Sequence, residues 1–219
     1  MWKSFLIVSS LAFVASAADF RLDSVNGLEL VNAKAEVVNY RGRPALRLLP
    51  AKNQVGDGSM LAVLAGSDFK NGTIQVDLAG APRAGTPPDS RGFIGIAFHL
   101  QQQAKRFECF YLRPTNARSD DQLRRNHTTQ YVSVPDFPWE RLRKENPGMY
   151  ESYVDLEPGA WTKVKVVVAG ATARLYVNDA QEPCLIVNEL KLGETNGSIA
   201  LWAHNTTDGY FSNLSYLLK

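Results

Sequence analysis

The residues best suited to chemistry lie at positions 113–131, which read RPTNARSDDQLRRNHTTQY. This run contains four arginines, two adjacent aspartates, two asparagines, two glutamines and one histidine. Guanidinium groups bind carboxylates and vicinal sugar hydroxyls through paired hydrogen bonds, and carboxamides both donate and accept. The pattern predicts a ligand-binding site in which aromatic side chains stack on a sugar ring. The candidate ligand-binding residues are Tyr111, Arg113, Asn116, Arg118, Asp120, Gln122, Arg124, Asn126, Gln130, Tyr131 and Trp139.

The same run is compatible with two other interpretations. One is catalysis, because His127 titrates near neutrality without help and Asp120 or Asp121 could act as an acid or base if burial and the arginines shift their pKa values. The other is a structural role, in which arginines and aspartates form ion pairs that hold a long loop onto the fold. The residues alone leave binding, catalysis and this structural role open.

The composition narrows the class of protein. The chain has 219 residues, 45% of them hydrophobic, and a formal net charge of +2. This content is ordinary for a globular protein with a sizeable core. Acidic residues are interleaved with the basic ones, so we expect no nucleic-acid partner. Without a phosphate loop, a dinucleotide fingerprint or a Cys-x-x-Cys pair, the sequence predicts no cofactor and no metal site.

The first 17 residues have the pattern of a secretory signal peptide. Lys3 provides a positive charge, residues 5–14 are apolar, and Ala15-Ser16-Ala17 fits the cleavage rule. A membrane anchor is the alternative, but the apolar run is short for a bilayer span. We therefore expect one mature domain at 18–219, secreted or periplasmic, without membrane insertion after cleavage. In such a protein Cys109 and Cys184 form a disulfide or remain free thiols, and the sequence leaves both open.

The elements that must position the candidate residues are short β-strands separated by turns. The segments 93–100 and 106–114 form one predicted hairpin, and 162–170 and 172–179 form a second. Between them, residues 113–149 read as a long irregular segment that contains one short helix within 136–148. Further strands are predicted at 45–49, 59–65, 72–80, 150–156, 184–190, 197–203 and 210–217. This spacing predicts an all-β sandwich.

Several of these segments resemble exported bacterial proteins of the concanavalin A-like lectin/glucanase group, laminin G-like in form. They are most similar to the branch labelled 3-keto-disaccharide hydrolase or domain of unknown function. The resemblance covers roughly residues 70–217 and implies an antiparallel jelly-roll sandwich with carbohydrate on its concave sheet. Because the group contains both lectins and glycosidases, the fold does not settle activity. The segments are GFIGIAFHL, FYLRPTNARSDDQLRRNHTTQY, YESYVDL, WTKVKVVV, ARLYVND and GSIALWAHNTTDGYFSNLSY.

The chain departs from the group's glucanases and calcium-dependent lectins. It lacks their Glu-x-Asp-x-x-Glu run, since YESYVDLE places Glu151 and Asp155 four residues apart with no carboxylate at 153. Pentraxin and legume-lectin calcium signatures are also absent. The leading prediction is therefore a carbohydrate- or glycoside-binding domain, with the ligand on the concave sheet near 113–131. Glu108 is a further ligand-binding candidate if it faces that sheet.

The resemblance implies a second hypothesis, a 3-keto-glycoside hydrolase that acts by elimination and hydration. That chemistry needs a general base and a group that stabilises an enolate. His127, Asp121 or Glu151 would be the base, and Arg113 or Arg125 would stabilise the enolate. A third hypothesis is a structural or adhesive sandwich without a small ligand.

Overall fold

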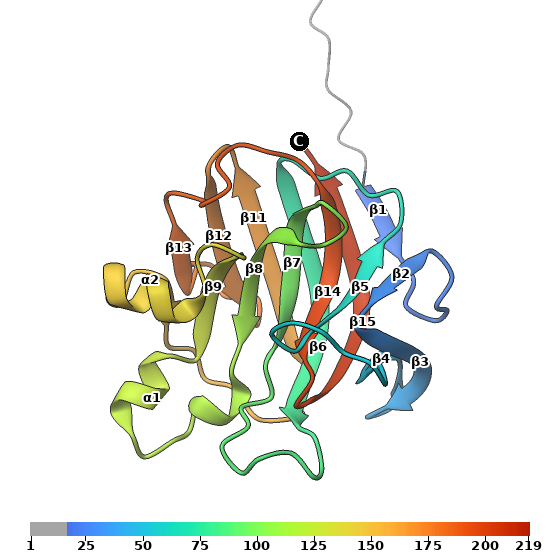
Figure 1. The fold of residues 1–219 in the computed structure, drawn as a ribbon, viewed down its shortest axis with the longest axis horizontal. Coiled ribbons are helices and arrows are strands. Elements are labelled where there is room, and N and C mark those ends of the chain that lie inside the picture. The colour runs from blue at the N-terminus through green and yellow to red at the C-terminus, as the bar shows by residue number, and fades with distance from the viewer. Residues whose placement is uncertain (1–16) are drawn as a thin grey trace, which may run out of the picture.

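Two antiparallel β-sheets packed face to face form the protein in a computed structural model that describes residues 17–219 (Figure 1). The predicted signal peptide therefore lies almost entirely outside the described residues. Sheet A has the order β13-β12-β11-β6-β15-β4-β3, with β1 also pairing with β15. Sheet B has the order β10-β9-β8-β7-β14-β5-β2. The predicted all-β antiparallel sandwich is confirmed.

The bounds of the elements are as follows. Sheet A contains β1 (Ala17–Phe20), β3 (Ala33–Tyr40), β4 (Arg43–Pro50), β6 (Gly72–Pro82), β11 (Thr162–Ala169), β12 (Thr172–Val177), β13 (Leu185–Val187) and β15 (Thr207–Leu218). Sheet B contains β2 (Leu28–Val31), β5 (Ser59–Leu64), β7 (Ile94–Gln101), β8 (Arg106–Leu112), β9 (Thr129–Val134), β10 (Glu151–Ser152) and β14 (Ser198–His204). The helices are the 3-10 helix η1 (Pro114–Asn116) and the α-helices α1 (Gln122–Asn126) and α2 (Trp139–Glu145).

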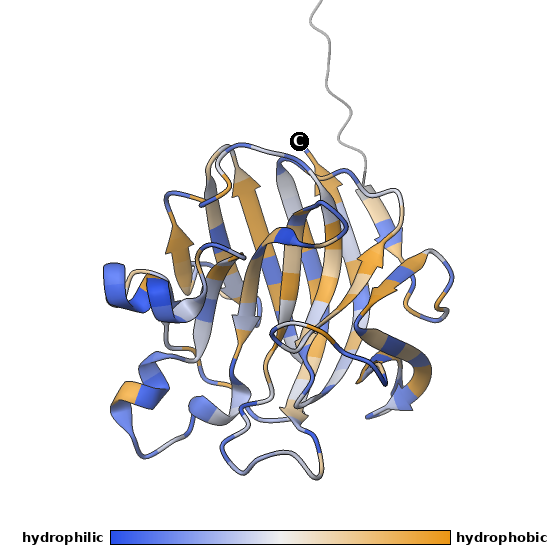
Figure 2. Ribbon diagram, in the orientation of Figure 1, coloured by the Kyte–Doolittle hydropathy of each residue, from blue (hydrophilic) through white to orange (hydrophobic). Residues whose placement is uncertain are grey.

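The core lies between the sheets, where alternate residues of each strand meet. In β11 the buried positions are Val164, Val166 and Val168, whereas Lys163 is exposed. Figure 2 shows the corresponding apolar and polar bands along the strands, with strongly polar α1 and α2. Sheet B differs from sheet A because β5, β7 and β8 are buried along nearly their whole length. The outer face of sheet B, the face turned away from sheet A, is therefore itself apolar.

Both predicted hairpins are present, as β7–β8 and β11–β12. The prediction of one irregular segment from 113 to 149 is wrong, because β9 lies within it and pairs with β8 along its full length. The polar residues Gln130 and Ser133 interrupt the hydrophobic alternation that would predict this strand, yet both are buried. The predicted strand at 150–156 is also too long, since only Glu151–Ser152 pairs with β9. The sequence did not predict β1, β2 and β3.

The predicted helix within 136–148 is confirmed as α2, although Pro138 occupies the N-cap position expected for Asp136. Leu142 anchors α2 in the core, and Trp139 lies at its first position, 36% exposed. The helix packs beside β9 at the edge of sheet B (Figure 1). Its position decides where Trp139 and Arg143 lie.

Both cysteines are free thiols, and Cys109 is completely buried. Burial raises the pKa of Cys109 well above its usual value and raises that of Cys184 to about 11. Of the two alternatives left by the sequence, the structure shows separate thiols. No helix in residues 17–219 has the length and apolar character needed to cross a membrane.

The two ends of the described chain lie together. β1 pairs with the end of β15, so that Ala17 faces Leu217. In Figure 1 this end is at the top, whereas α1 and the loop of residues 83–92 lie at the bottom.

Candidate functional site

A groove crosses the outer face of sheet B, and its first section is apolar. This section has a volume of about 260 Å³ and is lined mainly by aromatic and aliphatic side chains. Tyr111 and Trp202 form part of its floor, with ring centroids 4.9 Å apart. The indole Nε1 of Trp202 donates to Ser59 Oγ at 3.0 Å, which fixes the ring. The aromatic lining residues are Phe93, Phe107, Tyr111, Trp139 and Trp202.

The second section of the groove is basic and has a volume of about 320 Å³. It shares Phe93 and Trp139 with the apolar section, so the two sections are continuous. Its other walls come from the loop of residues 83–92, the end of β8, η1, α2 and the turn after β14. The charged and polar side chains in its lining include Asp89, Arg91, Arg113, Asn116, His127, Arg143 and His204. We call the two sections the apolar end and the basic end.

Arg113 is the most extensively bonded side chain at the basic end. It directly follows β8 and is 4% exposed. Its Nη1 donates to Glu151 Oε1 and to the His127 carbonyl, each at 3.0 Å. Its Nη2 donates to Tyr111 Oη and Gln130 Oε1, also at 3.0 Å. Arg113 therefore joins β8, β9 and β10 into a rigid unit beneath the groove.

Glu151 receives a second guanidinium from helix α2. Arg143 Nε donates to its Oε2 at 2.9 Å, and Arg143 Nη2 donates to its Oε1. Burial by itself would raise the pKa of Glu151, but the hydrogen bonds and charges of Arg143 and Arg113 outweigh it and hold the pKa below its usual value. Glu151 is thus an ionised structural anchor, and two arginines already occupy its oxygens.

His127 lies between the basic end and a neighbouring cavity of about 550 Å³. Its Nε2 is 3.5 Å from Glu151 Oε2. Burial lowers the pKa of His127, and the charges of Arg143 and Arg113 lower it further, although Glu151 opposes them. The lowered pKa favours the neutral imidazole, the form that accepts a proton.

Asn116 organises another pair of arginines through a neutral group. Its Oδ1 accepts from Arg91 Nη1 at 3.1 Å and from Arg124 Nε at 3.0 Å. Its Nδ2 donates to the His127 carbonyl at 3.0 Å. Arg124 also donates to Thr115 Oγ1 at 3.2 Å. Two guanidinium groups are thus held beside the basic end by an amide rather than by a carboxylate.

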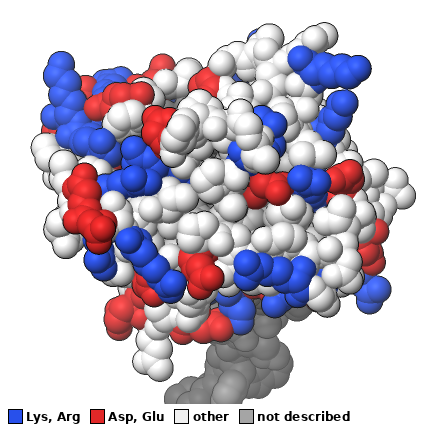
Figure 3. All heavy atoms as spheres, turned by 90° about the horizontal axis from the view of Figure 1, so that it is seen from below, with Lys and Arg blue, Asp and Glu red and all other residues white. Residues whose placement is uncertain are grey.

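The outer part of the 113–131 run has local bonding roles. Asp121 caps α1 by accepting from the backbone of Leu123 and Arg124. Arg118 pairs with Asp155 and Glu157 at the surface. The lower side of the molecule, where α1 lies in Figure 1, carries interspersed acidic and basic side chains (Figure 3). Gln122 bonds Asn126, Arg125 contacts Tyr153, and Asp120 is exposed.

The structure thus divides the predicted site residues into several groups. The candidates that line the groove are Tyr111, Arg113, Asn116, His127 and Trp139. Glu151 and Asn126 instead line the neighbouring cavity behind His127. Gln130 is buried beneath Arg113. The candidates outside all of these linings are Arg118, Asp120, Asp121, Gln122, Arg124 and Arg125.

Glu108 and Tyr131 lie on the opposite face of sheet B, toward the core. Both are completely buried, and Tyr131 Oη is hydrogen-bonded to Glu108 Oε2 at 2.5 Å. Glu108 Oε1 accepts from the backbone of Leu192 at 2.7 Å. Burial raises the pKa of Glu108 despite these bonds. The pair fastens the segment after β13 to sheet B and does not line the groove.

Sequence reasoning missed several residues of the groove lining. Arg91 lies near the end of a Pro- and Gly-rich loop that reads only as a connection, and Phe93 directly follows that loop. Trp202 and His204 belong to β14, which pairs with β7. Arg143 had one available signal, since it lies four residues after Trp139 on the same helix. Its guanidinium carbon is 4.5 Å from the centroid of that indole ring.

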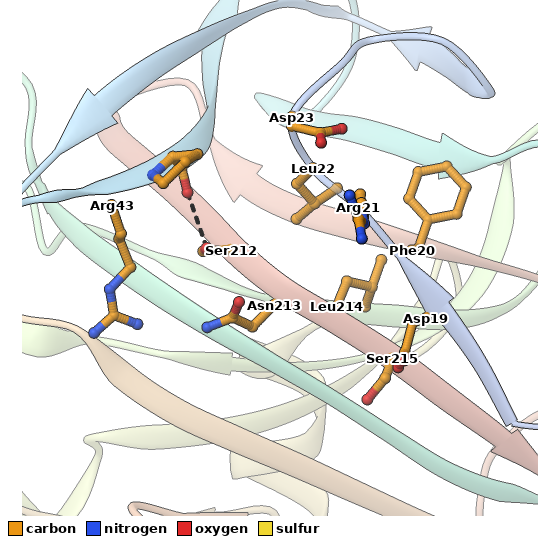
Figure 4. A pocket seen from close by; sticks show the side chains of 11 residues that line it. Asp19, Phe20, Arg21, Leu22, Asp23, Arg43, Ser212, Asn213, Leu214 and Ser215 are labelled. Carbon is orange, nitrogen blue, oxygen red and sulfur yellow. Dashed lines mark hydrogen bonds between the residues drawn. The ribbon is translucent and has the colours of Figure 1, made fainter.

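A larger pocket of about 560 Å³ lies on sheet A beside β15, between β1 and β4 (Figure 4). Asp19, Asp23 and Arg43 line it, with Phe20 as its one aromatic side chain. Arg43 is already paired with Asp77 at 2.8 Å. None of the predicted site residues lines this pocket, and it lacks the aromatic floor of the groove.

No protein-family model matches the chain, and no curated protein sequence matches it either. Solved structures do resemble it. The carbohydrate-binding module CBM66 from Bacillus subtilis aligns with a TM-score of 0.57 and 13% identity, over 86% of this chain and 94% of that one. A protein of unknown function with a galectin-like fold, from the same organism, aligns with a TM-score of 0.59 and 10% identity, over 94% and 100% of the two chains.

The exoplasmic domain of VIP36, described with bound calcium and mannose, is a third similar structure. It aligns with a TM-score of 0.55 and 9% identity, over 92% of this chain and 88% of that one. At such identities these similarities establish the fold, which is that of galectin-like and concanavalin A-like sandwiches. Among the described residues, no group of three or more His, Cys, Asp or Glu is arranged to hold a metal ion.

Proposed function

We propose that this protein is a carbohydrate-binding domain whose ligand lies in the groove on sheet B. The observation that carries the proposal is the continuity of an aromatic floor with a basic end rich in hydrogen-bond donors. Sugar rings have apolar faces that stack on aromatic rings and hydroxyl edges that bind planar polar groups. The resemblance to CBM66 and to the VIP36 domain supports the same class of ligand.

Trp139 is the residue on which the proposed binding depends most. It lines both ends of the groove and is 36% exposed, so a ligand can reach its ring. Arg143 lies over the indole, with its guanidinium carbon 4.5 Å from the ring centroid, and holds the ring in place. A ring fixed before binding loses little conformational entropy when the ligand arrives.

The location of the protein is part of this proposal. The pattern of residues 1–17 supports export through a signal peptide, followed by a mature domain at 18–219. A secreted or periplasmic protein would meet polysaccharides outside the cytoplasm. N-terminal sequencing of the exported protein tests this directly, with Ala18 as the expected first residue.

Screening against an array of oligosaccharides, followed by calorimetric titration of the ligands found, tests the binding function. Trp139→Ala should weaken affinity about tenfold, the effect of losing roughly 1.4 kcal/mol of stacking energy. Trp161→Ala is a matched control, since Trp161 also has an arginine over its ring, Arg43 at 4.8 Å, but directly precedes β11 of sheet A and lies outside the groove lining. Equal affinity of Trp139→Ala and the unaltered protein for every ligand found would refute this site.

A 3-keto-glycoside hydrolase is the second candidate function, and the neutral imidazole of His127 at the basic end supports it. His127 would remove the proton from C2, which the C3 ketone makes acidic. The electron pair then forms an enolate, and the aglycone leaves C1 with its bonding electrons and gains a proton. Water adds to C1 and a proton returns to C2, which completes hydrolysis.

The other catalytic candidates fit this role less well. Asp121 caps α1, Glu151 is occupied by two arginines, and Arg125 lies outside the groove. Arg113 and Arg143 line the basic end, so one of them would stabilise the enolate oxygen rather than Arg125. Incubation with 3-keto-glycosides should give turnover that His127→Ala abolishes, whereas unmodified glycosides should remain intact. A His127→Ala variant with full turnover would exclude this mechanism.

A further inference from the structure

The basic end of the groove holds more positive charge than its acidic groups balance. Arg113 and Arg143 share the single carboxylate of Glu151. Arg91 and Arg124 share the neutral amide oxygen of Asn116. Within residues 17–219, neither Arg91 nor Arg124 forms a salt bridge with an aspartate or glutamate. Three arginines of the basic end and the adjacent Arg124 are thus accompanied by one paired carboxylate, that of Glu151.

The one acidic residue in the lining does not cancel this excess. Asp89 is exposed, and Arg91 Nε bonds to its backbone carbonyl at 3.0 Å rather than to its carboxylate. Burial lowers the pKa of Arg91, and the charges of Arg124, Arg113 and Arg143 lower it further, although the charge of Asp89 opposes them. Arg91 thus lies among other positive charges, and a bound anion would reduce the repulsion between them. Such a group of positive charges inside a concave site attracts an anionic group of a ligand.

The position of these positive charges relative to the aromatic floor narrows the ligand class. Trp139 and Phe93 lie at the junction of the two ends, where the guanidinium carbon of Arg143 is 4.5 Å from the Trp139 ring centroid and that of Arg113 is 5.6 Å from the Phe93 ring centroid. We propose that the groove selects acidic glycans, with a sugar carboxylate or sulfate ester at the basic end and the remaining rings along the apolar end. This inference rests on the proposed carbohydrate-binding function and specifies its ligand.

Arg91 is the side chain that the anion would contact. It lines the basic end, and its guanidinium already has one Nη1 bond to Asn116 and one Nε bond to Asp89, which leaves its Nη2 for a ligand. Arg113, by comparison, has both Nη atoms bonded to four protein oxygens. Selectivity for acidic sugars should therefore depend on Arg91.

Matched pairs of oligosaccharides test the inference. Galacturonan, mannuronan and glucuronan oligomers are each compared with their carboxyl-reduced counterparts by calorimetric titration, and a sulfated galactan is compared with its desulfated form. We expect at least one acidic member to bind about tenfold or more tightly than its neutral counterpart, with affinity that falls as salt rises. The uronate and sulfate arms distinguish which anionic group the site takes.

Two variants that each remove one positive charge show where on the protein the preference for acidic sugars arises. Arg91→Gln should bring the ratio of the two affinities, acidic member over neutral member, close to one. Arg174→Gln removes the same charge from β12 of sheet A and should retain the preference. Thermal unfolding checks that both variants fold, and if Arg91→Gln does not, the comparison of matched sugars on the unaltered protein still decides the question.

The outcomes separate the two proposals. If neutral members bind as well as acidic ones, the preference for acidic glycans is refuted while carbohydrate binding stands. If no oligosaccharide of either kind binds, both proposals fail. An acidic preference that persists in Arg91→Gln and disappears in Arg174→Gln would refute the placement at the basic end.

Discussion

Three arginines at the basic end and Arg124 beside it form two pairs that meet different partners. Arg113 and Arg143 converge on the carboxylate of Glu151, whereas Arg91 and Arg124 converge on the amide of Asn116. The first pair is neutralised in part and joins β8, β10 and α2. The second pair retains its charge beside the groove. Under the proposed function, the partner rather than the arginine decides whether a guanidinium group stabilises the fold or is left to bind a ligand.

The largest effect is expected where the first pair is broken. Arg113→Met leaves Glu151 with one guanidinium and leaves Tyr111 Oη, Gln130 Oε1 and the His127 carbonyl without this donor. Removing one partner of a buried ion pair costs about 3–5 kcal/mol. Urea denaturation should show a loss of that order, against less than about 1 kcal/mol for Arg91→Gln. Equal losses of unfolding free energy in Arg113→Met and Arg91→Gln would show that the two pairs contribute equally to stability.

A smaller effect should appear as a pH dependence of stability. The pKa of Glu151 is lower in the folded protein than its usual value of 4.5, so the folded state binds this proton less readily than the unfolded state. Its contribution is fully present above about pH 4.5 and decreases as pH falls through the folded pKa. Urea midpoints measured from pH 6 to pH 3 should therefore decline more steeply for the unaltered protein than for Glu151→Gln. Parallel curves of urea midpoint against pH for the two proteins would contradict the lowered pKa of Glu151.

Asn116→Asp would convert the second pair into a copy of the first. The new carboxylate would lie between Arg91 and Arg124, but it would lose the bond from Nδ2 to the His127 carbonyl. We expect a change in unfolding free energy within about 1 kcal/mol, since these effects oppose each other. Affinity for acidic sugars should fall about tenfold while that for neutral sugars is retained. Calorimetric titration of both ligand types measures this, and unchanged binding of acidic sugars would refute the role of uncompensated charge.

The smallest effect is expected at Arg118, which belongs to neither pair. It forms exposed ion pairs with Asp155 and Glu157 outside the groove. Solvent screens such pairs and their side chains remain mobile, so they contribute little. Arg118→Ala should leave both the urea midpoint and sugar affinity unchanged within error. A loss of affinity would mean that the ligand extends beyond the groove toward α1.

The sequence was most informative where hydrophobic alternation was regular. The hairpin β7–β8 follows from this alternation, as does β11–β12 with Val164, Val166 and Val168. The strand β9 was hidden because Gln130 and Ser133 are polar residues buried in tertiary contacts. Gln130, for instance, bonds Arg113 and the Tyr150 carbonyl. A local pattern does not reveal bonds between residues that are distant in sequence.

The candidate site shows the same limit. The 113–131 run contributes Arg113, Asn116 and His127 to the groove lining, and its residue types drew attention to them. Arg91 and His204 reach the same lining from segments on either side, because β7 lies between β8 and β14 in sheet B. Their meeting depends on strand order, which short-range spacing does not encode.

The pairing of Ala17 with Leu217 also has a practical consequence. Both ends of the described chain lie opposite the loop of residues 83–92, which lines the basic end (Figure 1). A tether attached at Lys219 would therefore hold the domain on a bead or sensor surface with the basic end of the groove turned toward solution. A catalytic module fused at that point would likewise be carried behind the groove, without obstructing access to a polysaccharide.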